Sequence, residues 1–154
     1  MVSRARFLPA VIDNRYEGRR IALVFFGFFT AITLVRSVIH IVAPDGGAGS
    51  IATIPLASFS ENGASAVIHA FALWGLSQLI VALVYIVALL RYRSLIPLLY
   101  ALAVVEYLVR LLIGLAKPVE LEGTAPGGVA NYVLVPLLLV MLWLSLRPRR
   151  VSTR

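Results

Sequence analysis

The fold of this chain is decided by residues 95–115, which read LIPLLYALAVVEYLVRLLIGL. A helix needs about 20 predominantly apolar residues to cross the hydrocarbon core of a bilayer, which is about 30 Å thick. This stretch is long enough, and its only charged residues are Glu106 and Arg110, one helical turn apart. Charges at such depth are costly and normally face a protein interior or a water-filled cavity. The pair therefore marks a candidate functional site.

The rest of the sequence has the same apolar character. Of the 154 residues, 60% are apolar and 14% are charged, and the mean hydropathy of +0.94 is far above that of soluble domains. Three further stretches are long enough to span a bilayer, at residues 21–42, 66–90 and 129–146. We predict one all-α integral membrane domain over residues 1–154, an antiparallel bundle of four transmembrane helices. A leader (residues 1–20) precedes the bundle and a basic tail (residues 147–154) follows it.

The distribution of charge predicts the topology. Arginines stand before the first stretch, between the second and third, and after the fourth: Arg4, Arg6, Arg15, Arg19, Arg20, Arg91, Arg93, Arg147, Arg149, Arg150 and Arg154. The two other connections hold Asp45, Glu61, Lys117, Glu120 and Glu122. By the positive-inside rule both termini lie in the cytoplasm, and the chain is a multi-pass protein of the cytoplasmic membrane. Because the basic residues act as topology signals, we discard nucleic acid as a partner despite the net charge of +7.

The sequence carries no recognised enzyme signature. Cysteine is absent, which excludes disulfides, thiolate metal sites and covalently attached haem. The nucleophile elbow, the H-E-x-x-H zinc motif, the P-loop and the dinucleotide-binding fingerprint are also absent. We therefore predict no catalytic residues, and the sequence leans against an enzyme without deciding the question.

Depth along the predicted helices groups the polar residues. A rise of about 1.5 Å per residue places Arg36 and Arg110 both about 22 Å above the cytoplasmic boundary and Glu106 at about 17 Å. The two histidines and an asparagine lie nearer the outer surface. We expect a polar cavity that opens to the outside. Its candidate ligand-binding residues are Arg36, His40, His69, Glu106, Arg110 and Asn131.

Charge accounting gives the leading functional hypothesis. With both histidines neutral, two arginines face one carboxylate, so one arginine needs another anion: Asp45, Glu61, a lipid phosphate or a substrate. We predict a membrane protein that binds a small anionic or amphiphilic ligand. The alternative is a structural or accessory subunit, in which the buried Arg/Glu/His cluster only fixes helix packing. Its partners are then the lipid bilayer and a second copy of the chain or another membrane protein.

A second alternative rests on the histidines. His40 and His69 come from neighbouring helices near the same surface, as a bis-histidine haem in a helical bundle requires. A divalent metal held by the same pair with Asp45 or Glu106 is the other form of this hypothesis. Two isolated histidines are a weak signal, so we predict no cofactor.

Two other features remain open at this point. The connection at residues 44–65 is either a lid over the site or a plain interfacial connector. Gly27, Gly75 and Gly114 permit close helix contact but form no G-x-x-x-G face, so the sequence does not decide the oligomeric state.

Several segments resemble known sequences. They are GLSQ at residues 75–78, RYRSLIPL at 91–98, EYLVR at 106–110, and PGG at 126–128 with Asn131. Together they are similar to small bacterial membrane proteins with four transmembrane helices and no assigned activity. The resemblance implies the fold and a bacterial inner membrane, and it implies no activity and no site residue.

Overall fold

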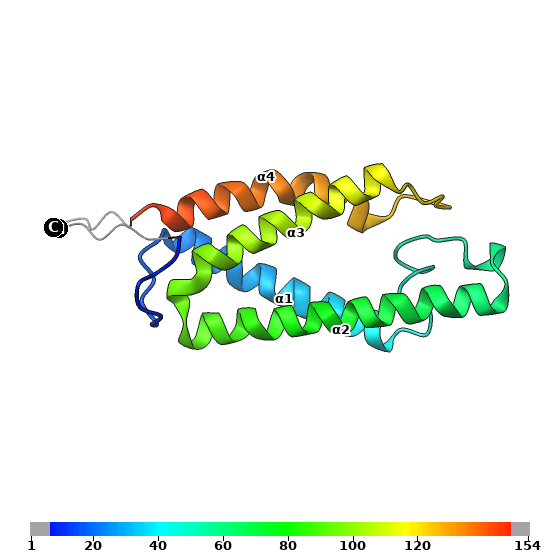
Figure 1. Ribbon diagram of the computed structural model, residues 1–154, viewed down its shortest axis with the longest axis horizontal. Coiled ribbons are helices and arrows are strands. Elements are labelled where there is room, and N and C mark those ends of the chain that lie inside the picture. The colour runs from blue at the N-terminus through cyan, green and yellow to red at the C-terminus, as the bar shows by residue number, and fades with distance from the viewer. Residues whose placement is uncertain (1–6, 149–154) are drawn as a thin grey trace.

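The computed structural model describes residues 7–148, and all regular secondary structure among them is helical (Figure 1). The elements are α1 (Arg20–Val42), η1 (Leu56–Ser58), α2 (Glu61–Arg91), η2 (Arg93–Leu95), α3 (Ile96–Ala116) and α4 (Pro126–Leu146). Each of the four α-helices is long and apolar enough to span a membrane. This confirms the prediction of four such helices. The outermost basic residues, Arg4, Arg6, Arg149, Arg150 and Arg154, lie outside the described part of the chain.

Helix α2 begins at Glu61, before the predicted start at Ala66. The side chain of Ser60 caps this end by accepting a hydrogen bond from the backbone N–H of Gly63 at 3.2 Å. Glu61 in the first turn adds a negative charge where the helix dipole favours one. With 31 residues the helix is about 46 Å long, which exceeds the thickness of the hydrocarbon core.

Helix α4 also begins earlier than the sequence analysis expects. It starts at Pro126, so Gly127 and Gly128 are helical. Proline suits the first position of a helix, because its missing N–H has no partner there in any case. The helix is 21 residues long, three residues longer at its start than the predicted span.

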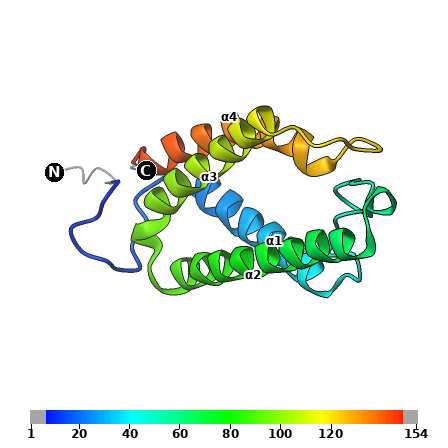
Figure 2. The same cartoon turned by 45° about the vertical axis from the view of Figure 1, so that its right-hand side comes forward.

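The four helices pack as two pairs. Helix α1 contacts chiefly α2, and α3 contacts chiefly α4. Figures 1 and 2 show the pairs close together where α2 joins α3 and diverging toward the opposite end of the molecule. The contacts between α2 and α3 are few. The seam between these two helices is therefore only loosely closed.

An aromatic core joins the pairs at the closed end. Phe26 of α1 packs against Tyr85 of α2 and Tyr100 of α3, with ring centroids 5.0 and 5.1 Å apart. The hydroxyl of Tyr100 donates a hydrogen bond to the carbonyl of Ala22 at 2.7 Å. Aromatic pairs of this kind contribute about 0.5–1.5 kcal/mol beyond their buried area. This core holds three helices together at one level.

The connections at the other end also meet. The carbonyl of Thr53 accepts a hydrogen bond from the backbone N–H of Glu122 at 2.9 Å, and its hydroxyl donates to the carbonyl of Gly123 at 3.2 Å. Residues 51–56 are half-buried. The long connection thus folds back and contacts the loop between α3 and α4.

Asp45 organises the turn after α1. Its carboxylate accepts hydrogen bonds from the backbone N–H groups of Ser50 at 2.6 Å and Gly47 at 2.8 Å. These bonds, that of Ser50 foremost, lower the pKa of Asp45 from 3.8 to about 2. Because the carboxylate is committed to this turn, it is not the second anion for an intramembrane arginine.

The lowered pKa of Asp45 predicts an acid-sensitive loop. A carboxyl group whose pKa is lower in the folded state stabilises that state fully above the unfolded pKa, here 3.8, and loses its effect as the pH falls through about 2. We expect the protection of the Gly47 and Ser50 amides from hydrogen exchange to fall over this range. The Asp45→Asn variant, which does not titrate, should show no such fall. Equal pH dependence of protection in both proteins would contradict the assignment.

Helices α1 and α2 approach closely at Gly75. A Cβ added there would lie 2.7 Å from Cβ of His40 and 3.0 Å from the carbonyl oxygen of Ser37. A Cβ added at Gly27 or at Gly114 would meet nothing within 4 Å. Of the three glycines that the sequence offers for close contact, only Gly75 lies at a contact between helices of this chain.

We expect the Gly75→Ala substitution to lower the free energy of unfolding by about 1–3 kcal/mol, since the two helices must separate to admit the methyl group. The matched control is Gly114→Ala, which should be neutral or stabilising by up to about 1 kcal/mol through helix propensity. Unfolding in a mixed micelle with increasing sodium dodecyl sulfate measures both. Two variants of equal stability would show that the contact is not tight.

Candidate functional site

Four polar side chains from three helices form a continuous hydrogen-bonded chain, which we call the polar chain. Nη2 of Arg36, on α1, donates to Oε1 of Gln78, on α2, at 2.9 Å. Nε2 of Gln78 donates to Oε1 of Glu106, on α3, at 2.9 Å. Nε of Arg110 donates to the same carboxylate oxygen at 3.0 Å, and its Nη2 also bonds this oxygen. The structure therefore brings together the three charged residues that depth analysis placed near one level.

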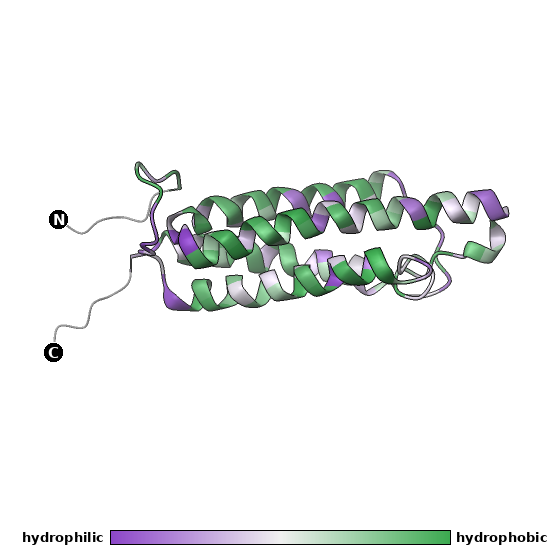
Figure 3. Ribbon diagram, turned by 90° about the horizontal axis from the view of Figure 1, so that it is seen from below, coloured by the Kyte–Doolittle hydropathy of each residue, from purple (hydrophilic) through white to green (hydrophobic). Residues whose placement is uncertain are grey.

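The hydropathy of the helices agrees with this placement. In Figure 3 the helices are mostly hydrophobic, and hydrophilic positions appear chiefly at their ends and in a few turns partway along them. The side chains of Arg110 and Glu106 keep 20% and 27% of their exposure. Arg110 and Glu106 are thus half-buried.

Gln78 is the link that the sequence analysis did not include among the candidate residues. A neutral amide offers both an acceptor and donors, so it can join a cation to a carboxylate without adding charge. Gln78 is buried, with 6% of its surface exposed. A glutamine in the middle of a predicted span is the sequence signal for this link, but because it carries no charge it does not mark a site as an ionisable residue does.

Trp74 and Tyr107 complete the surroundings of the two guanidinium groups. Cζ of Arg110 lies 4.8 Å and Cζ of Arg36 lies 5.4 Å from the centre of the Trp74 ring. The hydroxyl of Tyr107 accepts a long hydrogen bond, 3.4 Å, from Nη1 of Arg36. Each cation–π contact contributes about 0.5–2 kcal/mol, more when water is excluded. Trp74 stands four residues before Gln78, so the sequence already predicts that both side chains lie on the same face of α2.

The charges of the site do not balance. Glu106 is the only carboxylate in the polar chain. Within residues 7–148, every hydrogen bond that Glu106 accepts on its side chain ends on Oε1, and none ends on Oε2. Arg36 contacts only neutral groups, and no carboxylate within the described part of the chain forms an ion pair with it. Its Nε is buried and has no hydrogen-bond partner among these residues. The site therefore carries one excess positive charge, centred on Arg36.

The two histidines lie in different environments. His40 is buried at 3% exposure, and its ring centre lies 4.7 Å from that of Trp74. Its Nδ1 lies 2.7 Å from the carbonyl oxygen of Gly46, which can only accept, so Nδ1 of the neutral ring carries the proton and Nε2 is the free acceptor. His69 is exposed and makes no side-chain hydrogen bond within residues 7–148. His40 belongs to the wall of the site, whereas His69 stands apart from it.

The remaining candidate residues are not part of the polar chain. Asn131 is half-buried on α4, and its side chain forms no hydrogen bond with the described residues. Glu61 is exposed in the first turn of α2, far along the helix from Gln78. Within residues 7–148 no three His, Cys, Asp or Glu side chains come close enough to hold a metal ion.

Comparisons with family models, with curated proteins and with solved structures give no match for this chain. The class of protein that fold and site define is an all-helical one, with four helices long and apolar enough to cross a membrane and a positively charged polar chain between three of them.

The link through Gln78 predicts a stability effect. We expect Gln78→Leu to lower the free energy of unfolding by about 1–3 kcal/mol, because Arg36 and Glu106 both lose a buried partner. Ser77→Ala is the matched control: Ser77 is exposed, and its hydroxyl bonds only the carbonyl of Leu73 in its own helix. Detergent unfolding compares the two variants. Equal stabilities would remove Gln78 as the link between the helix pairs.

Proposed function

We propose that this chain is a bacterial inner-membrane protein that binds a small anionic or amphiphilic ligand at the polar chain. In this proposal the helices form an antiparallel transmembrane bundle with both termini in the cytoplasm. The connection that carries Arg91 and Arg93 lies at the same end of the molecule as the start of α1 and the end of α4 (Figure 1). Three arginine-rich segments at one end support this orientation under the positive-inside rule.

The unpaired guanidinium group of Arg36 is the observation that carries the proposal. An arginine at the centre of a transmembrane helix costs about 2.5–3.5 kcal/mol on insertion scales, and Arg36, in the outer half of α1, bears part of this cost. Neutral acceptors and the face of Trp74 reduce this cost but leave the charge uncompensated. A phosphate or carboxylate that pairs with Arg36 would relieve it, because such anions match the fork of donors on a guanidinium group.

The neighbours of Arg36 suit anion binding. Arg110 adds a second guanidinium group over the same Trp74 ring, and Glu106 orients Arg110 through two hydrogen bonds. His40 packs against the same Trp74 ring, but with Nδ1 donating to Gly46 its Nε2 accepts and does not donate to an anion. Glu106 is therefore assigned an orienting role and not that of a catalytic acid.

The alternative function is a structural one. The polar chain joins α1, α2 and α3 through side-chain hydrogen bonds alone, as a cluster that only fixes helix packing would do. In that case the excess charge meets a second copy of the chain or a partner membrane protein. A measurement of ligand binding distinguishes the two functions.

We test binding with the protein in nanodiscs of phosphatidylcholine, with inorganic phosphate and hexadecyl phosphate as probes. The chain has two tryptophans, so a Trp143→Phe background leaves Trp74, beside both guanidinium groups, as the fluorescent reporter. We expect the probes to raise the thermal unfolding midpoint and change the Trp74 emission. Arg36→Gln should weaken binding by at least about tenfold, the equivalent of about 1.4 kcal/mol.

Two further variants serve as controls. Arg91→Gln changes an exposed arginine of the α2–α3 connection and should bind as the parent does. Arg36→Lys keeps the charge without the planar fork and should bind with intermediate affinity. Unchanged binding in folded Arg36→Gln, or no response of the parent protein to either probe, would overturn the proposal in favour of the structural role.

A further inference from the structure

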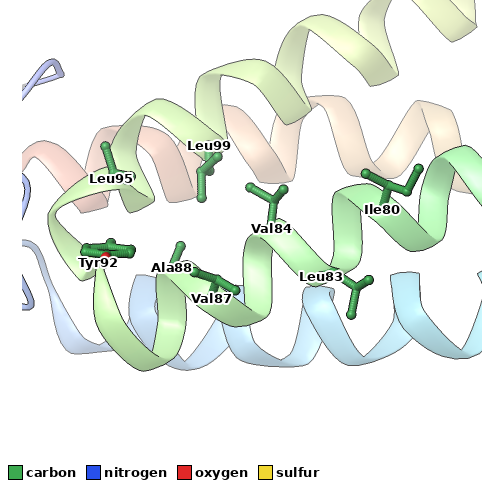
Figure 4. A pocket seen from close by; sticks show the side chains of 8 residues that line it. All are labelled: Ile80, Leu83, Val84, Val87, Ala88, Tyr92, Leu95 and Leu99. Carbon is green, nitrogen blue, oxygen red and sulfur yellow. The ribbon is translucent and has the colours of Figure 1, made fainter.

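An apolar groove lies between α2 and α3 on the side of the α2–α3 connection. Its volume is about 290 Å³, and its walls include Ile80, Val84 and Val87 of α2 and Leu99 of α3. Val84 and Leu99 point toward one another from the two helices (Figure 4). Tyr92 closes the groove at the cytoplasmic end in the proposed orientation, and its hydroxyl is the only polar group among the lining side chains. The groove is therefore built to hold hydrocarbon.

The α3 wall of the groove continues into the polar chain. Leu99, Glu106 and Arg110 follow one another at spacings of seven and four residues, so they lie on one face of α3, and Leu95 stands four residues before Leu99, at the end of η2. From Leu99 to Glu106 this face is about 10 Å long. An extended molecule against this face has one end beside aliphatic side chains and the other beside a guanidinium group.

The polar chain reaches the same face of α3. Gln78 lies two residues before Ile80, so it stands on another, buried face of α2 than the groove, but its amide donates across the seam to Glu106 at 2.9 Å. The polar chain thus meets α3 at Glu106, seven residues after Leu99 of the groove. Few contacts close the seam between the two helices, so it opens sideways to the bilayer.

We infer that the ligand is a long-chain anionic amphiphile, with its head group at Arg36 and Arg110 and its hydrocarbon chain in the groove. This rests on the proposed function and specifies the ligand class of the same site. Charge complementarity selects the head group, because the site has one excess positive charge and the groove has none. The amphiphile enters laterally from the bilayer, with its head toward the outer surface and its chain toward the cytoplasm.

The hydrocarbon chain of the amphiphile contributes to its affinity by tethering the head group and by packing in the groove. Lipid tails are as apolar as the groove, so transfer from bilayer to groove yields no hydrophobic gain. A chain in the groove instead holds the head group at the depth of Arg36, which raises its effective concentration there. We expect hexadecyl phosphate to bind at least on the order of a hundredfold more tightly than inorganic phosphate. Hexyl phosphate, which is too short to fill the groove, should fall between them.

Photo-crosslinking in phosphatidylcholine nanodiscs locates the hydrocarbon chain of the bound amphiphile. The probe is hexadecyl phosphate with a diazirine near the end of its chain, and labelled residues are mapped by mass spectrometry. We expect labelling to concentrate on the groove, at Val84, Val87 and Leu99, and to be lost in Arg36→Gln. Unlabelled hexadecyl phosphate should compete, whereas a diazirine-bearing phosphatidylcholine should label all lipid-facing surfaces evenly.

A variant that blocks the groove distinguishes the contribution of the hydrocarbon chain to affinity from that of the head group. Val84→Trp fills the groove and should weaken hexadecyl phosphate by on the order of tenfold while leaving inorganic phosphate unchanged. The matched control, Leu108→Trp, changes an exposed side chain on the face of α3 opposite Leu99 and should bind both probes as the parent does.

Each other outcome has a distinct meaning. Equal affinity for the three phosphates, or labelling spread over all lipid-facing helices, would overturn the inference and leave anion binding at Arg36 intact. Groove labelling that depends on Arg91 and not on Arg36 would also overturn it, since the phosphate would then lie at the cytoplasmic turn. Full binding of every probe by Arg36→Gln would overturn the proposed function itself.

Discussion

The amide of Gln78 is the interaction on which the site depends. It receives a hydrogen bond from a guanidinium group of one helix and gives one to a carboxylate of another, both at 2.9 Å. Inside a bilayer there is no bulk water to satisfy either partner, so each must find its hydrogen bonds within the protein. A neutral link between them keeps three helices in register at this level. It also leaves Arg36 without a countercharge, and that is the source of the chemistry that we propose.

The rest of the molecule divides around this level. On one side an aromatic core holds α1, α2 and α3 together, and on the other the helix pairs diverge until two loops meet at Thr53. Gly75 keeps α1 close to α2, and through that approach it holds His40 against Trp74. Few contacts close the seam between α2 and α3, and apolar side chains line it near the α2–α3 connection. The binding site that we propose, for a molecule with one charged and one apolar end, rests on this arrangement.

The sequence predicted the charged members of the site but not its neutral ones. Depth along each helix depends only on residue count and on the membrane boundary, so the sequence predicts Arg36, Glu106 and Arg110 near one level, and in the structure hydrogen bonds join them through Gln78. Rotation of one helix against its neighbour depends on packing, which residue count does not contain. For this reason Gln78 and Trp74 were missed, although both stand on the face of α2 that turned out to be buried. For the same reason His69 was expected near the site, and it is exposed.

The sequence by itself determined the four apolar helices, since backbone groups in hydrocarbon must be satisfied within a helix and the length of each apolar stretch matches the core of a bilayer. It also determined that charges lie within them. Only the tertiary structure decided which helices pair, that Asp45 serves a loop, and that a glutamine joins the charged residues. It alone showed an apolar groove between α2 and α3. These features depend on how helices rotate and pack against one another, and many side chains along each helix share in setting that packing.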